Sequence, residues 1–384
     1  MTQRSFDTRD YLLAAGATAV FALFGHWIRD ELAVLGAIVC GLTLGVALCA
    51  RARSLRLACL LLFSIALVIA TAEAVLLAME DSPTRYGSHY RGYYDRVSEL
   101  GYRPNPSASI LASKYRSDGS LIYEARYTID ARQQRETPWW GARRAGGTVL
   151  FFGGSFAFGE GLQDDETLPY AFSASTGFAY RVRNFGFHGY GPHQALRALE
   201  IGLDADIEGP VPFAVYYLIP PHIDRAAGEA SWDLHGPEYQ LNERGEVVFV
   251  GHFTEHWNWP ANALRASALY RRTAALRAQP ERYKVALTRK ILEGVRNLVG
   301  ERHGAELIVL CWDVWEGHAE TTEALKNALR DGGFEVLLAS EVLLASEVLG
   351  ELGDGSFTIP DDGHPTAEAN RRIGRALAER IGSR

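Results

Sequence analysis

The chain has few cysteines, and their spacing excludes several kinds of site. Only 4 of the 384 residues are cysteine, and no two have the spacing of a zinc site or of a disulfide framework. Three lie in apolar segments, and Cys311 stands alone in the apolar run 307–312, which is typical of a buried strand. The sequence therefore predicts no metal site, and nothing in it implies a cofactor.

Positive charge is also scarce. The formal net charge is −7, and no region has a sustained block of lysine and arginine. A protein that binds nucleic acid normally presents a basic face to the phosphates. We therefore expect no nucleic-acid partner.

Long apolar stretches are confined to the start of the chain. Those at 11–28, 32–50 and 56–79 are each near the ~20 residues that a helix needs to cross about 30 Å of hydrocarbon. A cleaved signal peptide has one short apolar core, so three consecutive stretches do not fit it. The sequence predicts a membrane domain with three transmembrane helices in residues 1–80.

Arginines predict the orientation of these helices. Arg51, Arg53 and Arg56 lie between the second and third stretches, whereas the first connection has no excess of positive charge. Short arginine-rich loops stay in the cytoplasm. We therefore expect a multi-pass protein of the inner membrane with a cytoplasmic N-terminus, and a periplasmic domain after about residue 80.

The rest of the chain divides into two parts. Residues 81–146 are polar and rich in turns, and predict a linker with a small β-rich lead-in that includes a strand or hairpin at 123–130. Residues 147–384 alternate short apolar runs with helical stretches. The predicted strands are 148–152, 180–184, 213–219, 307–312 and 334–338, and the predicted helices are 166–176, 192–203, 280–300, 320–330 and 366–382.

This alternation predicts an α/β fold, a three-layer α/β/α sandwich with a mainly parallel five-stranded sheet. An insert at about 226–275 interrupts it, with a hairpin expected around 242–245 and an aromatic cluster at 256–259. The hexapeptide 335–340 is repeated at 341–346. We expect the first copy in the last strand and the second in a helix or loop.

Ser155 follows the first predicted strand and two glycines. Open α/β sheets bind ligands at the carboxyl ends of their strands, and glycines allow a sharp turn there. Backbone N–H groups at a following helix start would face a developing negative charge. The pattern predicts a nucleophile, although a serine that caps an ordinary turn has the same pattern.

A second polar segment, Asp361-Asp362-Gly-His364-Pro, lies near the other end of the chain. Histidine is the usual base for a serine nucleophile, and a carboxylate orients it and stabilises its charged form. Both aspartates are close enough in sequence to reach the His364 ring. An acidic turn before a capped helix is the alternative interpretation.

A third segment, Asn184-Phe-Gly-Phe-His-Gly189, follows the second predicted strand. Glycines at a strand end allow a backbone N–H group to face a reacting oxygen. A simple turn is again the alternative.

Together the three segments resemble the SGNH/GDSL hydrolase family over residues 147–384, which implies a flavodoxin-like sheet. Gly153-Gly-Ser155 resembles the first block, whose serine is the nucleophile, although Gly154 stands where the family usually has Asp. The segment 184–189 resembles the second block, which would make the Gly189 N–H an oxyanion donor.

Asp361-x-x-His364-Pro resembles the fifth block, which supplies acid and base. Asp361 has the commoner spacing for the acid, and Asp362 is the alternative. In the third block the family has an Asn that donates to the oxyanion, and this chain has none near 217–225. His222 falls about where that Asn would lie and could donate instead, or could be a polar residue at a loop start.

The resemblance implies a serine esterase that acts through an acyl-serine intermediate, with an ester-bearing glycan or lipid as substrate. One alternative is an O-acyltransferase that passes the acyl group to a sugar hydroxyl with the same triad. Another is a catalytically inactive binding or assembly protein on the same fold, which the missing third-block Asn favours and the retained Ser, Asp and His oppose.

Overall fold

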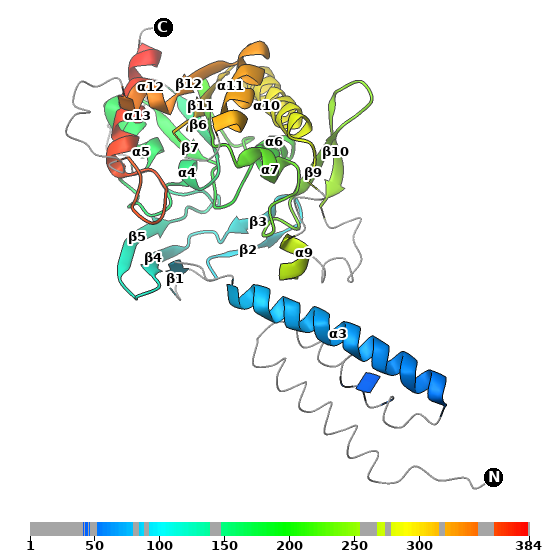
Figure 1. Cartoon of the computed structure of the whole chain (residues 1–384). Coiled ribbons are helices and arrows are strands. Elements are labelled where there is room, and N and C mark those ends of the chain that lie inside the picture. Colours follow the sequence, from blue (N-terminus) through cyan, green and yellow to red (C-terminus); the bar gives the residue numbers. More distant parts are fainter. Residues whose placement is uncertain are drawn as a thin grey trace. The chain divides into compact units, whose positions relative to one another are not determined.

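The chain is seen in a computed structural model that describes residues 41, 43, 44, 46, 52–79, 84–87, 92–138, 147–253, 267–272, 278–314, 319–344 and 357–382. It divides into two compact units, which we describe separately (Figure 1). One unit contains Met1–Ser82 and Trp257–Ala278, and the other contains Pro83–His256 and Gln279–Arg384.

The first unit contains a long apolar helix, α3 (Arg53–Met79). Its segment Arg53–Glu73 is long and apolar enough to cross a membrane, the only such helix in the part of the chain that the structure describes. The predicted helix at 56–79 is thus confirmed as a helix, whereas 11–28 and most of 32–50 lie outside the described residues. The Glu73 carboxylate accepts hydrogen bonds from the Ser267 hydroxyl (2.8 Å) and the Leu269 N–H (3.0 Å), at the start of α9 (Ala268–Arg272).

The second unit is built on the predicted sheet of five parallel strands, in the order β12-β11-β8-β6-β7. The strands are β6 (Thr148–Gly153), β7 (Arg181–Asn184), β8 (Phe213–Leu218), β11 (Glu306–Cys311) and β12 (Glu335–Leu338). Every residue of β6 and β8 is buried, which explains their continuous apolar sequence. All five predicted strands are confirmed, with ends that differ by one residue or less.

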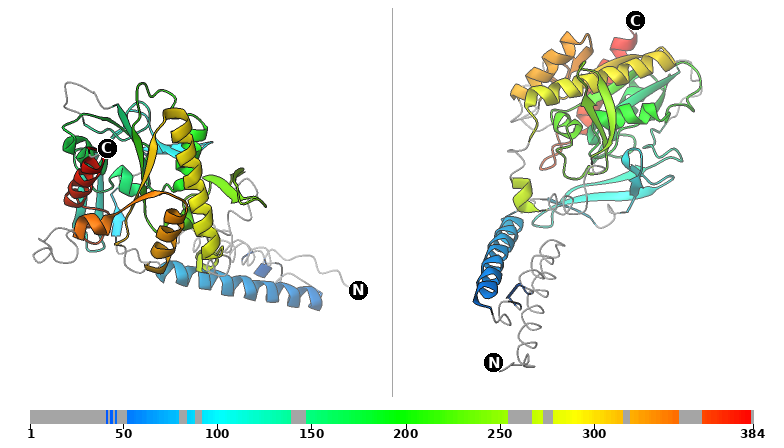
Figure 2. Two further views of the ribbon diagram at one scale, coloured as in Figure 1. Left: turned by 90° about the horizontal axis from the view of Figure 1, so that it is seen from above. Right: turned by 90° about the vertical axis from the view of Figure 1, so that its right-hand side faces the viewer.

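Helices cover both faces of this sheet, which confirms the three-layer sandwich (Figure 2). Leu150 and Phe152 of β6 face one core, and Val149 and Phe151 face the other, because side chains alternate along a strand. One core packs against α6 (Pro192–Glu200), α10 (Glu281–His303) and α11 (Ala319–Asp331), and the other against α5 (Leu168–Ser175) and α13 (Ala367–Gly382).

The insert and the repeat also follow their predictions where they are described. The hairpin consists of β9 (Pro237–Leu241) and β10 (Val247–His252), and the aromatic cluster at 256–259 lies outside the described residues. The first hexapeptide copy contains β12, and α12 (Ala339–Leu344) begins at its end and continues into the second copy.

The lead-in is β-rich, as predicted, but its described part is more than a linker. It contains β1 (Thr84–Tyr86), β2 (Tyr94–Val97), β3 (Gly101–Pro104), β4 (Ser109–Arg116) and β5 (Leu121–Thr128). A third apolar core joins its residues, such as Ala125 and Tyr127, to Phe158 and Phe187 of the sandwich. The composition of 81–146 concealed this because its strands are only partly buried.

Candidate active site

Ser155 lies at the carboxyl end of β6, where the strand turns into the short helix α4 (Ser155–Phe158). Its residue surface is 5% exposed. Gly153 has φ +144°, and a Cβ atom there would lie 2.8 Å from the carbonyl oxygen of Tyr217 on the next strand. Only glycine fits this turn, which presents the Ser155 hydroxyl at the edge of the sheet.

His364 reaches Ser155 from a loop just before α13. The loop is closed by a hydrogen bond from the Ile359 N–H to the His364 carbonyl oxygen (2.7 Å). The His364 Nε2 atom lies 2.8 Å from the Ser155 Oγ atom. The structure thus brings together a serine and a histidine that are 209 residues apart in sequence.

The partner of His364 is Asp362, not the favoured candidate Asp361. The Asp362 Oδ2 atom lies 2.6 Å from the His364 Nδ1 atom, and its side chain is fully buried. Asp361 adopts φ +60°, and its half-exposed carboxylate accepts a hydrogen bond from Arg116 (2.6 Å) instead. Family spacing suggested Asp361, but the left-handed turn leaves it at the surface and puts the next residue against the ring.

Both partners of this pair are charged more readily than usual. Burial alone would lower the pKa of His364, but the negative charge of Glu160 and the hydrogen bond and charge of Asp362 raise it. Burial alone would raise the pKa of Asp362, but its hydrogen bond to His364 and the charge of His364 lower it. Lys114 also contributes to this lowering through a hydrogen bond to Asp362 Oδ1 (2.6 Å). The arrangement favours a carboxylate beside an imidazole that accepts a proton easily.

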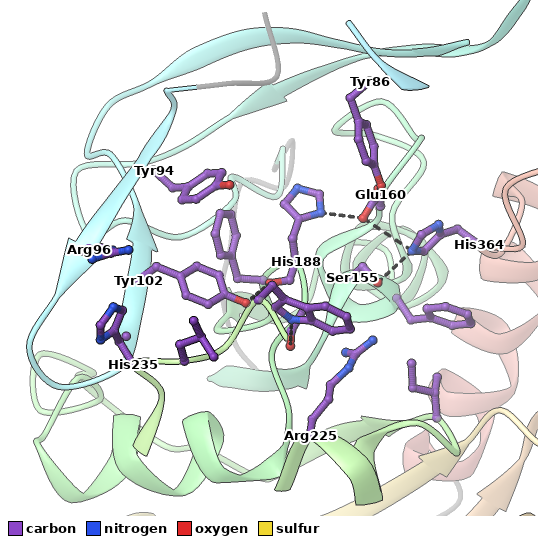
Figure 3. A pocket seen from close by; sticks show the side chains of 17 residues that line it. Tyr86, Tyr94, Arg96, Tyr102, Ser155, Glu160, His188, Arg225, His235 and His364 are labelled. Atoms are coloured by element: carbon purple, nitrogen blue, oxygen red, sulfur yellow. Dashed lines mark hydrogen bonds and ion pairs between the residues drawn. The ribbon is translucent and has the colours of Figure 1, made fainter. Parts of the chain in front are cut away.

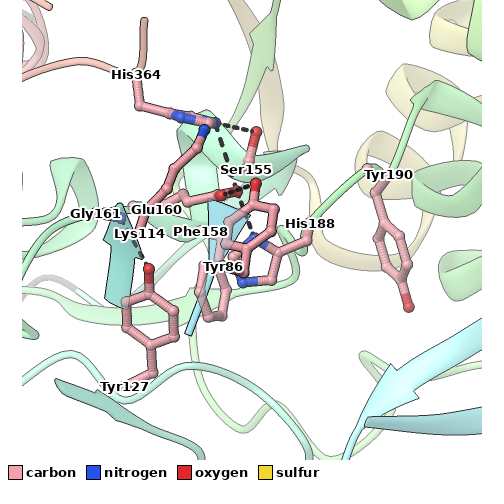
Figure 4. A network of polar contacts seen from close by, with 12 residues as sticks. Tyr86, Lys114, Tyr127, Ser155, Phe158, Glu160, Gly161, His188, Tyr190 and His364 are labelled. Atoms are coloured by element: carbon pink, nitrogen blue, oxygen red, sulfur yellow. Dashed lines mark hydrogen bonds and ion pairs between the residues drawn. The ribbon is translucent and has the colours of Figure 1, made fainter. Parts of the chain in front are cut away.

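A second buried carboxylate, Glu160, lies beside the triad (Figure 4). It accepts hydrogen bonds from His188 Nδ1 (2.6 Å), from Tyr86 Oη (2.9 Å) and from Tyr123 Oη (3.2 Å). Burial alone would raise the pKa of Glu160, but the charge of His364 and the contact with His188 lower it. Burial lowers the pKa of His188 despite this carboxylate, so we assign it a neutral ring that donates its Nδ1 proton to Glu160.

Backbone N–H groups are available near Ser155. In the part of the chain that the structure describes, no hydrogen bond uses the N–H of Ser155 or of Gly189. Gly189 lines the same cavity as Ser155 and has φ +70°. A Cβ atom there would lie 2.4 Å from Nε1 of Trp232, so this position requires glycine.

His222 does not line this cavity. Its ring is fully buried, its Nδ1 atom lies 3.0 Å from Tyr216 Oη, and its Nε2 atom has no hydrogen-bond partner. Nε2 lies 3.1 Å from where a Cβ atom of Gly154 would be, so the ring is behind the nucleophile turn. Burial keeps the pKa of His222 well below its usual value, so the ring is neutral.

The cavity above Ser155 has a volume of about 590 Å³ and is lined by residues from three parts of the chain (Figure 3). The lead-in contributes Tyr86, Tyr94, Arg96 and Tyr102, and the insert contributes Trp232, Leu234 and His235. The sandwich contributes Ser155, Glu160, Phe187, His188, Gly189, Arg225 and His364. Aromatic rings dominate the walls away from the serine. The cavity is large enough for more than a short acyl group.

One group of described residues has the composition of a metal site. Ligand atoms of Glu160, Asp362 and His364 lie within 4.8 Å of one another. Both ring nitrogens of His364 already face Asp362 and Ser155, and the Lys114 ammonium group pairs with Asp362. These contacts account for the cluster without an ion, and a cation here would meet the charge of Lys114.

The chain is similar to solved structures of esterases. Over 62% of this chain and 98% of the other, it is 13% identical to a member of the lipolytic protein G-D-S-L family from Veillonella parvula, with a TM-score of 0.36. Over the same shares, it is 13% identical to the carbohydrate acetylesterase Est24 from Sinorhizobium meliloti, with a TM-score of 0.35. No protein-family model and no curated protein matches the chain.

Sequence reasoning missed three side chains of this site. Glu160 interrupts the apolar run after Ser155, and a carboxylate in a run that must be buried is a signal of function. Arg225 follows the third strand by seven residues, next to the candidate His222. Lys114 gave no signal, since its contact with Asp362 spans 248 residues and depends on the tertiary fold.

Proposed function

We propose that this protein is a serine esterase that transfers acyl groups through an acyl-serine intermediate. The observation that carries the proposal is the continuous hydrogen-bonded chain from Ser155 through His364 to Asp362, with distances of 2.8 and 2.6 Å. This is the constellation in which a histidine activates a serine and a carboxylate fixes the imidazole. Gly189 completes the site as an N–H donor.

In the proposed mechanism, His364 Nε2 takes the Ser155 proton while Oγ bonds to the ester carbonyl carbon. The carbonyl oxygen becomes an oxyanion, held by the N–H groups of Ser155 and Gly189. When the carbonyl re-forms, the alcohol leaves with the proton from His364. Water then repeats the sequence on the acyl-serine and releases the acid.

Asp362 contributes by holding one tautomer. Its Oδ2 accepts the Nδ1 proton of His364, so Nε2 is left as the basic nitrogen. Lys114 holds the other oxygen of the carboxylate, which fixes its orientation. The buried ion pair thereby keeps Asp362 available to the imidazolium that forms in the transition state.

For the substrate, we propose an O-acyl group on a glycan. The rings of Tyr94, Tyr102 and Trp232 line the cavity and offer flat apolar faces with polar tips, which suit the alternating faces of a sugar. The apolar helix α3 and the arginines at its amino-terminal end support a membrane anchor with the catalytic domain on the periplasmic side. A lipid ester is the alternative substrate for such a location.

The proposal is tested on the full chain in detergent with p-nitrophenyl acetate and a fluorophosphonate probe. We expect hydrolysis and labelling in the wild type, and loss of both in Ser155→Ala, with kcat reduced on the order of 10⁴-fold or more and an unchanged melting temperature. A wild type that is neither labelled nor active would favour the inactive binding protein.

The O-acyltransferase remains the second candidate because the cavity extends well beyond the serine and could hold an acceptor. Adding oligosaccharide acceptors to active enzyme that has not been treated with the fluorophosphonate probe, with p-nitrophenyl acetate as the acyl donor, separates the two. Transfer of acetyl to sugar at the expense of free acetate would identify a transferase, whereas unchanged acetate release would identify a hydrolase.

A further inference from the structure

Two departures from the family pattern lie side by side in this structure. One is Gly154, which stands where the family usually has Asp, and the other is the segment after β8, which lacks the usual Asn. A Cβ atom at Gly154 would lie only 2.7 Å from Nη1 of Arg225, in α7 (His222–Ala226) after β8. A side chain at position 154 would displace this guanidinium group, so the missing side chain makes room for Arg225.

Arg225 is buried and only partly satisfied. The residue is 9% exposed, its Nη1 donates to the Tyr190 carbonyl oxygen (2.7 Å), and its Nε has no hydrogen-bond partner. In the described part of the chain it makes no ion pair, although the charges of Asp233 and Glu160 act on it from farther away, and its Cζ atom lies 5.6 Å from the centroid of the Trp232 ring. A guanidinium group is always charged, and burying it without a counter-ion is strongly unfavourable. The Arg225 guanidinium group therefore retains hydrogen-bonding capacity that a negatively charged oxygen could use.

We propose that Arg225 is the side-chain donor of the oxyanion hole and takes the place of the missing Asn. The proposal rests on the acyl-transfer function above. Arg225 lines the same cavity as Ser155 and Gly189, and Figure 3 shows its side chain extending toward Ser155. His222, the candidate from the sequence, lies outside that cavity.

The chemistry suits a cation. When Ser155 Oγ bonds to the carbonyl carbon, the electron pair of the C=O π bond moves to the oxygen and the serine proton moves to His364. Arg225 hydrogen-bonds the resulting oxyanion and transfers no proton. Because the ester oxygen is neutral before the attack, the charged donor stabilises the transition state more than the bound substrate.

The first test is Arg225→Ala, measured with p-nitrophenyl acetate. We expect kcat to fall roughly 10²–10³-fold with little change in KM. Guanidinium or methylguanidinium ions should restore part of the activity, because a small cation can enter the space left by the side chain. Arg197→Ala is the control: Arg197 stacks on Phe249 outside the cavity, so its loss should leave kcat unchanged and gain nothing from guanidinium.

A wild-type kcat in Arg225→Ala, or a loss expressed only in KM, would overturn the proposal. So would a loss of kcat that guanidinium does not restore in a variant with an unchanged melting temperature. If Arg225→Ala does not fold, Arg225→Gln, which keeps N–H donors but no charge, replaces it. For Arg225→Gln, a kcat between those of the wild type and Ser155→Ala supports the proposal, and a wild-type kcat overturns it.

A double-mutant cycle with Gly154 tests the spatial argument. Gly154→Ala places a Cβ atom 2.7 Å from Arg225 Nη1 and 2.9 Å from the Tyr190 carbonyl oxygen that accepts the Arg225 hydrogen bond. We expect it to lower kcat, and the double variant with Arg225→Ala to lose less than the two single losses combined. Additive losses would mean that the two positions act independently and would overturn the proposal.

An enzyme that depends on Ser155 but not on Arg225 would defeat only this inference and leave the acyl-transfer function intact.

Discussion

The Glu160 Oε2 atom lies 3.5 Å from Nε2 of His364, the same nitrogen that is 2.8 Å from the Ser155 hydroxyl oxygen. The imidazole therefore has a carboxylate on each side, because Asp362 contacts Nδ1 at 2.6 Å. Glu160 is fixed by His188 and two tyrosines, so it cannot move away when His364 becomes charged. We expect the charge of Glu160 to set the pH above which His364 is neutral and can act as the base.

Glu160→Gln should shift the pH dependence of kcat/KM. The pKa of His364 is raised, first of all by the negative charge of Glu160, and only the neutral imidazole can accept the serine proton. The acid limb of the profile should thus lie above the usual histidine value in the wild type and move to lower pH in Glu160→Gln. The plateau should also fall, because the imidazolium of the transition state loses a nearby negative charge.

The measurement is kcat/KM for an aryl ester across the acid and neutral range. Glu200→Gln is a matched control, since Glu200 pairs with Arg197 and Tyr239 away from the cavity and should leave the limb in place. An acid limb that stays at its wild-type pH in Glu160→Gln would show that this carboxylate does not govern the base.

The two neighbouring aspartates should differ greatly in their effect on activity. Asp362→Asn should lower kcat by roughly 10⁴-fold, because an amide opposite Nδ1 favours the wrong tautomer of His364. Asp361→Asn removes only a half-exposed ion pair with Arg116 and should keep kcat within about a factor of two. Each variant supplies the control for the other. A larger loss in Asp361→Asn would restore the assignment made from family spacing.

Much of the sandwich could be predicted because its determinants are local. The runs at β6, β8 and β11 are buried on both faces, so they are continuously apolar and easy to identify. Ser155 and His364 could be found because they follow short, distinctive turns.

The choice of Asp362 over Asp361, and of Arg225 over His222, could not be predicted because each depends on contacts across the fold. Asp362 is selected over Asp361 by a left-handed turn and by Lys114, which lies 248 residues away in the lead-in. Arg225 and His222 share one short helix, and only the folded structure shows that Arg225 lines the cavity whereas His222 does not. The role of the lead-in itself was hidden because its strands make their own small sheets and contribute to the site through single side chains.

The aromatic wall should affect glycan esters and not small esters. Tyr94 is 40% exposed and lines the cavity from β2, away from the triad. Tyr94→Ala should raise KM for an O-acetylated oligosaccharide about five- to tenfold, as expected when one aromatic contact worth roughly 1 kcal/mol is lost. Tyr94→Phe should keep the ring and most of the affinity. Equal effects of Tyr94→Ala on p-nitrophenyl acetate and on the oligosaccharide would argue against a sugar-binding wall.

The arginines at the amino-terminal end of α3 predict on which side of the membrane the catalytic unit lies. A reporter that is active only after export, such as alkaline phosphatase, should be active when fused after Arg384, and a reporter that folds only in the cytoplasm should be inactive there. The same two reporters fused after Ala52, before α3, should give the opposite result.

Removing residues 1–50 tests the part played by the first two apolar stretches. Arg51, Arg53 and Arg56 would then mark the amino-terminal end of the single apolar segment that remains, so the carboxyl end should still be exported. Cytoplasmic activity at Arg384 in the full chain would place Ser155 inside the cell and exclude a periplasmic glycan as its substrate.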